Sequence, residues 1–178
     1  MVTKTVREFA SRFKIDPHNP HSVIPVIREI KHLKPEIVSV RDLDALYAKR
    51  TAEDILHSGR VVMLSKEDRQ RAKNVLGCVD NAIALVAVLR AHGIKADFAR
   101  IGNSSIVLFK MAGREWSVNP ARYARRSVPT EVTPADLRGH ETLRRMGLFA
   151  RGKDAWHIGM KSLKDYDRYS KADRKGNF

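Results

Sequence analysis

The hydrophobic pattern of the chain centres on one stretch, residues 82–89, which contains no polar side chain. A helix that is apolar on every side is enclosed by protein, so this stretch predicts a buried central helix. Gly93 marks its end, because glycine adopts the left-handed cap conformation without steric cost. Cys78, the only cysteine of the chain, therefore lies at the N-terminal mouth of the predicted helix.

Short runs rich in β-branched and aromatic residues follow this helix and predict strands over residues 95–101, 105–111 and 115–120. Residues 112–114, Ala-Gly-Arg, favour a hairpin turn between the last two. An apolar spacing of three and four residues predicts helices over residues 3–13 and 21–34. Start signals at Ser65 and at Thr133-Pro134 predict two more, over residues 65–76 and 133–146.

Between residues 39 and 64 the elements are shorter. The apolar stripe after Ser39 predicts one helical segment, and Thr51, with Asp54 three residues later, resembles a capping start for another. Residues 61–64 are apolar and predict either a strand or a packed turn. The elements together predict an α+β fold: N-terminal helices, then a central Cys-bearing helix packed on a small antiparallel sheet. We divide the chain into an N-terminal helical extension (1–50), a core (51–165) and a basic, flexible tail (166–178).

Composition changes this picture mainly through charge. The 178 residues carry a formal net charge of +14, and the last third of the chain holds half of it. Such an excess attracts polyanions, nucleic acid or nucleoprotein first and anionic membrane second, although it also fits a solubilising surface. The candidate binding residues are those of the basic helix and of the Arg-rich segment after the third strand: Arg69, Arg71, Lys73, Arg122, Arg125 and Arg126.

Other features exclude several classes of protein. No apolar run reaches the roughly 18 residues that a membrane span needs, and the first residues lack the apolar block of a signal peptide. A single cysteine excludes an intrachain disulfide. The sequence has neither zinc-type Cys/His spacing nor a Gly-rich phosphate loop. We therefore expect a cytoplasmic protein with no metal and no cofactor, which binds nucleic acid or a nucleoprotein, and for which a protein partner is an open alternative.

Cys78 allows two interpretations. The unpaired N–H groups and the positive dipole end of a helix favour a thiolate, which is the geometry of a cysteine nucleophile. Buried cysteine also commonly serves as a small hydrophobic residue of the core.

The run G-C-x-x-x-A-x-x-x-x-A-x-L-R-A-x-G-I-x-A at residues 77–96, followed by G-x-x-W-x-V-x-P at 113–120, resembles the transglutaminase-like superfamily with its papain-like core. The resemblance covers residues 51–120. It implies that Cys78 matches the nucleophile, that Ser105 or Ser104 stands at the histidine position, and that Asn119 stands at the aspartate position.

Asparagine can still orient an imidazole, but serine cannot replace the histidine, because its hydroxyl is not a base near neutral pH. The resemblance therefore implies a pseudoenzyme with a degenerate triad. Together with the net charge, it leads us to expect a module that binds an anionic macromolecule. The alternative is an active cysteine-dependent acyl transferase or peptidase, in which a relocated base such as His157 or His140 serves Cys78. A third reading is a structural component of a larger complex.

Overall fold

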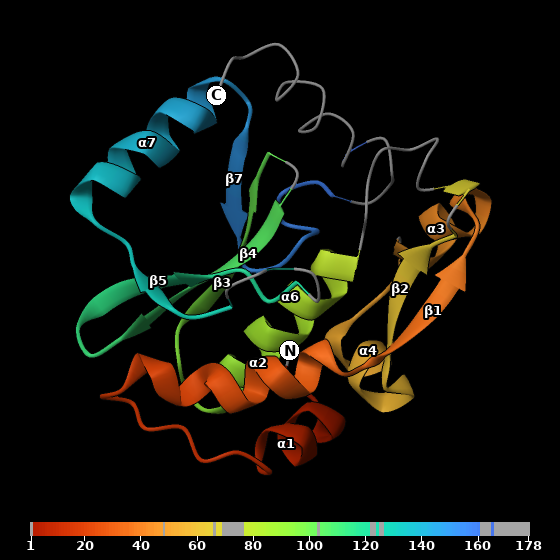
Figure 1. Ribbon diagram of the computed structural model, residues 1–178, viewed down its shortest axis with the longest axis horizontal. Coiled ribbons are helices and arrows are strands. Elements are labelled where there is room, and N and C mark those ends of the chain that lie inside the picture. The colour runs from red at the N-terminus through yellow and green to blue at the C-terminus, as the bar shows by residue number, and fades with distance from the viewer. Residues whose placement is uncertain are drawn as a thin grey trace.

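The computed structural model describes residues 2–47, 49–65, 67–68, 77–102, 104–121, 124, 127–160 and 165. The fold is α+β, with a central helix against a small antiparallel sheet (Figure 1). The central helix is α6 (Gly77–Ala91), and its side chains from Ala82 to Leu89 are wholly or largely buried.

A five-stranded antiparallel sheet, in the order β6-β5-β4-β3-β7, covers one side of α6. The strands are β3 (Ala96–Ile101), β4 (Ser104–Met111), β5 (Arg114–Val118), β6 (Thr130–Glu131) and β7 (Phe149–Gly152). Alternation along the strands sends Phe98, Val107 and Phe109 into the core shared with α6. Ala99 and Leu108 point to the opposite face, where α7 (Pro134–Arg145) packs along β7.

The N-terminal helices complete the enclosure of α6. They are α1 (Lys4–Ala10), the 3-10 turn η1 (Pro20–Val23) and α2 (Ile24–Lys31). Val6, Ile27 and Ile30 are buried in the same hydrophobic core as α6 and the sheet. One apolar core therefore continues from the first helix to the sheet.

A two-stranded parallel sheet lies beside this core, formed by β1 (Lys34–Val38) and β2 (Arg60–Leu64). Strand β1 corrects the sequence prediction, because the helix expected to reach Lys34 ends at Lys31 and the chain then becomes extended. Lys34 and Val38 bond to the β2 side, so the backbone of Pro35 faces away from β2. A proline is tolerated on such an outer edge because it has no N–H to donate.

The connection from β1 to β2 contains α3 (Val40–Tyr47) and α4 (Ala52–Ser58). The capping start at Thr51 is confirmed, since its hydroxyl accepts from Asp54 N and the Asp54 carboxylate accepts from Thr51 N. Gly59 ends α4 at a φ of +63°. Residues 61–64, for which the sequence leaves a strand and a packed turn as alternatives, form most of strand β2.

The prediction of three strands after α6 is confirmed, and the hairpin turn has positive φ at Ala112 and Gly113. Strand β7 was missed, because residues 149–152 become a strand only by pairing with β3. The basic helix expected over residues 65–76 lies mostly outside the described residues, as does the tail expected over 166–178. Among the helices that the structure describes, none has the length and apolarity needed to cross a membrane.

Two isoleucines, one buried and one exposed, test whether the N-terminal helices belong to the shared core. We expect Ile30→Ala in α2 to lower the free energy of unfolding by about 2–5 kcal/mol, because this fully buried side chain leaves a cavity in the core. Ile37→Ala in β1 removes a side chain that is 57% exposed and should change it by less than about 0.5 kcal/mol. Urea unfolding measures both. If Ile30→Ala left the main transition unchanged, the N-terminal helices would not belong to the cooperative core.

Candidate functional site

Cys78 is the second residue of α6 and points into the core rather than to solvent, with 9% of its surface exposed. The helix begins at Gly77, five residues before the apolar run at 82–89, which sets the thiol in the first turn. It packs in the same cluster as Val79 and Ala82. The thiol is thus at the expected helix mouth, but it is covered.

Arg100 of β3 brings a charged group to this thiol. Its Nη1 lies 4.0 Å from Cys78 Sγ and donates to Ser105 Oγ at 3.2 Å. Arg100 and Ser105 are register partners on β3 and β4, so both side chains stand on the face toward α6. Arg100 is 1% exposed and Ser105 is fully buried.

This register distinguishes the two serines at the expected histidine position. Ser105 faces Arg100 and the thiol, whereas Ser104 pairs with Ile101 and alternates to the other face of the sheet. The structure therefore brings Cys78 and Ser105 to one place, with a guanidinium in contact with both.

Asn119, at the expected aspartate position, follows β5. Its Oδ1 accepts from Ala121 N at 3.0 Å, which makes a local turn. The next residue is tied to the helix, because Asn81 Nδ2 donates to Pro120 O at 3.0 Å. The segment after β5 is thus held against the first turn of α6, while the amide oxygen of Asn119 serves its own turn.

The two histidines considered as replacement bases are held elsewhere. His157 Nδ1 lies 3.0 Å from Asp154 Oδ1, with more than half of the His157 side chain exposed. His140, on α7, stacks on Phe149 with ring centroids 4.6 Å apart. Because α7 covers the face of the sheet away from α6, the sheet separates His140 from the thiol.

The six basic residues predicted to bind an anion, Arg69, Arg71, Lys73, Arg122, Arg125 and Arg126, lie outside the described residues. Their described neighbour Ala124 is positioned by α2, since Lys31 Nζ donates to Ala124 O at 3.2 Å. Partial burial lowers the pKa of Lys31.

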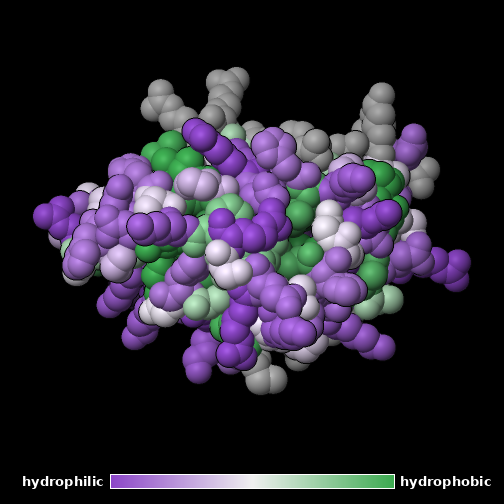
Figure 2. All heavy atoms as spheres, turned by 90° about the horizontal axis from the view of Figure 1, so that it is seen from below, coloured by the Kyte–Doolittle hydropathy of each residue, from purple (hydrophilic) through white to green (hydrophobic). Residues whose placement is uncertain are grey.

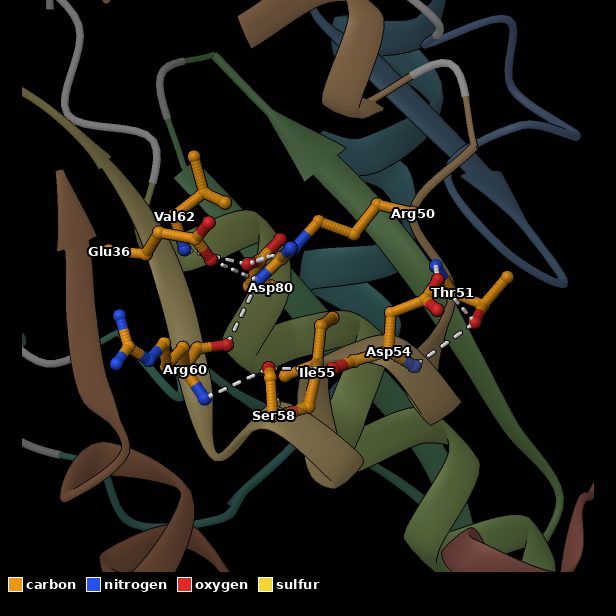
Figure 3. Close-up of polar contacts among 9 residues, drawn as sticks. All are labelled: Glu36, Arg50, Thr51, Asp54, Ile55, Ser58, Arg60, Val62 and Asp80. Atoms are coloured by element: carbon orange, nitrogen blue, oxygen red, sulfur yellow. Dashed lines mark hydrogen bonds and ion pairs between the residues drawn. The ribbon is translucent and has the colours of Figure 1, made fainter. Parts of the chain in front are cut away.

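A second polar cluster lies two residues further along α6 (Figure 3). Asp80 Oδ2 accepts from Arg50 Nε at 2.7 Å and from Val62 N at 2.8 Å. Arg50 Nη2 also donates to Arg60 O at 3.0 Å and lies 3.7 Å from Glu36 Oε2. This cluster joins β1, β2 and the entry to α4 to the first turn of the central helix.

The electrostatics of the cluster are dominated by burial. Asp80 is fully buried, and loss of hydration raises the pKa of its carboxyl to about 6, against the opposing effects of Arg50 and the Val62 N–H. Asp80 Oδ1 and Asn81 Oδ1 are buried without a hydrogen-bond partner in the described part of the chain.

Sequence reasoning missed Arg50, Asp80 and Arg100. Two signals could have found them. An aspartate at the start of an otherwise apolar helix requires a buried partner, and the alternation Ala96, Phe98, Arg100 places the arginine on the core face of its strand. In the residues that the structure describes, no three His, Cys, Asp or Glu side chains converge as a metal site needs. Comparisons with protein family models, curated proteins and solved structures find no match.

Asp80 gives a prediction that a titration can check. We expect its carboxyl carbon, followed by NMR, to titrate with a midpoint near 6. Because the folded state then holds this proton more tightly than the unfolded state, the stability that Asp80 contributes is full below about pH 4 and is lost as the pH rises through 6. Urea unfolding should therefore show that the free energy of unfolding of the wild type falls, relative to that of Asp80→Asn, as the pH rises over this range.

Asp136 provides a control within the same spectra. Hydrogen bonds from the Thr133 hydroxyl and backbone lower the pKa of this exposed carboxyl. Its midpoint should lie below the ordinary value of 3.8, opposite in direction to that of Asp80. A midpoint for Asp80 at or below that of Asp136 would contradict the assignment of a dehydrated carboxyl.

Proposed function

We propose that the chain is a transglutaminase-like domain without the catalytic histidine, and that it acts as a cytoplasmic binding module for nucleic acid or a nucleoprotein. Arg100 is the observation that carries the non-catalytic part, since its guanidinium contacts both Cys78 and Ser105. A guanidinium only donates hydrogen bonds and keeps its proton at physiological pH. It therefore cannot be the general base that a thiol nucleophile relies on.

The nature of the partner follows from charge. The net charge of +14 favours a polyanion, whose phosphates Lys and Arg neutralise without reading sequence. The first 34 residues contribute seven lysines and arginines against three acidic residues. The face that carries α1 and α2 is covered largely by hydrophilic side chains (Figure 2).

One contact brings the basic end of α2 to a described residue of the segment after β5. We define the basic end of α2 as Arg28, Lys31 and Lys34, of which Arg28 and Lys34 are exposed. Lys31 bonds to Ala124 O, and in the sequence Ala124 stands within the Arg-rich segment. The basic end of α2 and that segment are thus joined by a direct hydrogen bond.

The state of the thiol tests the non-catalytic part. Because Cys78 is the only cysteine, all alkylation by iodoacetamide reports on this residue, and Cys78→Ser gives the background. We expect the folded protein to react at least about tenfold more slowly than the urea-unfolded protein at neutral pH, because Sγ is covered. Faster reaction of the folded protein than of free cysteine would instead favour the thiol enzyme.

The polyanion is tested by fluorescence anisotropy with a labelled single-stranded RNA over a salt series. We expect the logarithm of the binding constant to fall linearly with the logarithm of the salt concentration, with a slope of about −0.7 for each phosphate contacted. Replacing Arg122, Arg125 and Arg126 by alanine should make the slope shallower by about 2. The double variant Arg28→Ala/Lys34→Ala should make it shallower by about 1.4.

The matched control removes three arginines from α7, on the opposite face of the sheet: Arg138→Ala, Arg144→Ala and Arg145→Ala. It lowers the net charge equally but should leave the slope within about 0.5 of the wild-type value. If the slope became shallower by the same amount in both triple variants, net charge alone would account for the attraction of the RNA. Absence of binding at low salt would overturn the proposal.

A further inference from the structure

One stripe of α6 is less deeply buried than the rest of the helix. Ile83, Ala87 and Arg90 are only partly buried, while every other position from Cys78 to Leu89 is buried. Their spacing of four and three residues places them on one face of the helix. The most apolar helix of the chain therefore keeps a narrow apolar strip, at Ile83 and Ala87, that the surrounding elements cover only in part.

A cavity of about 460 Å³ lies over this strip, and we call it the α6 cavity. Ile83 and Ala87 form the accessible part of its helical wall, and the buried Val86, Phe98 of β3 and Ala155 lie behind them in the core. The volume falls within the range of small-molecule sites, which are mostly apolar with a few polar groups. Trp156 lines the cavity and is 41% exposed, so an aromatic ring stands at its opening.

The charged groups of the lining differ in how they are already engaged. Arg50 is bound to Asp80, and Arg90 bonds to Ala96 O and lies 3.4 Å from Asp97. The acids are also engaged, Glu53 by the Thr5 hydroxyl and Asp154 by His157.

Lys153 differs from these groups, because it is exposed and has no ion-pair partner within 4.0 Å among the described residues. Of the three cations in the lining, Arg50, Arg90 and Lys153, only Lys153 is thus without an ion pair among the described residues.

We propose that the α6 cavity binds a small amphiphile with an apolar, aromatic-sized body and one anionic group. The body lies on Ile83 and Ala87 beside the indole of Trp156, and the anionic group pairs with Lys153. Apolar area supplies the affinity, and the ammonium distinguishes the anion from a neutral molecule of the same shape. This site is separate from the basic end of α2, so either proposal stands if the other fails.

The test compares two fluorescent probes of similar aromatic body, 8-anilinonaphthalene-1-sulfonate and the uncharged N-phenyl-1-naphthylamine. We expect the sulfonate to bind the folded protein saturably, with one molecule per chain. Lys153→Glu should weaken the sulfonate by about tenfold and leave the neutral probe within about twofold. Lys14→Glu makes the same charge change at an exposed lysine that does not line the cavity, and it should leave both probes unchanged.

Two further substitutions test the cavity itself. Ala87→Trp fills the space above the strip and should weaken both probes at least about tenfold, whereas Ala135→Trp on the exposed surface of α7 should not. Trp156→Ala removes a ring that is already half in solvent, so it keeps the test decisive if Ala87→Trp does not fold; it should weaken both probes. Wild-type binding in Trp156→Ala, or equal effects of Lys153→Glu on the two probes, would overturn the proposal.

Discussion

A helix with no polar side must be enclosed from every direction, and the architecture around α6 follows from this requirement. The five-stranded sheet covers one side, and α1, α2 and α4 cover others, all within one hydrophobic core. Elements that are far apart in sequence therefore meet because each buries apolar surface on the same helix. The enclosure is incomplete at Ile83 and Ala87, which are only partly buried and line a cavity.

The first turn of α6 carries the polar exceptions, and each is tied to a different partner element, although Asp80 Oδ1 and Asn81 Oδ1 have no hydrogen-bond partner in the described part of the chain. Asp80 is held by Arg50 and by the backbone of β2, Asn81 by the carbonyl of Pro120, and Cys78 lies against Arg100. Removing one member of a buried ion pair leaves an uncompensated charge, which is costlier than the pair itself is favourable. The pairings therefore fix how the two sheets meet the helix more than they add to stability.

What the sequence predicted depended on the range of the interactions. The buried helix, the hairpin after Met111 and the capping box at Thr51 rest on residues close together in the chain, and all three are confirmed. Strands β1 and β7 exist only through pairing with distant strands, and their local sequences contain proline or glycine. At the candidate site, the sequence pattern singled out Cys78 and, with Ser104 as the alternative, Ser105, and Arg100 contacts both Cys78 and Ser105. The guanidinium beside them became visible only when the register of β3 and β4 was known.

Pro35 has a consequence for how the protein behaves in a crowded solution. The outer edge of β1 would otherwise offer backbone groups to a strand of another molecule, which is a common beginning of aggregation. Pro35 has no N–H to give, so Ile37 is left as the main donor along that edge, and the register of hydrogen bonds with an incoming strand is interrupted. Because its outer edge pairs poorly with a further strand, the two-stranded sheet can lie at the surface of the molecule without adding a strand from another molecule.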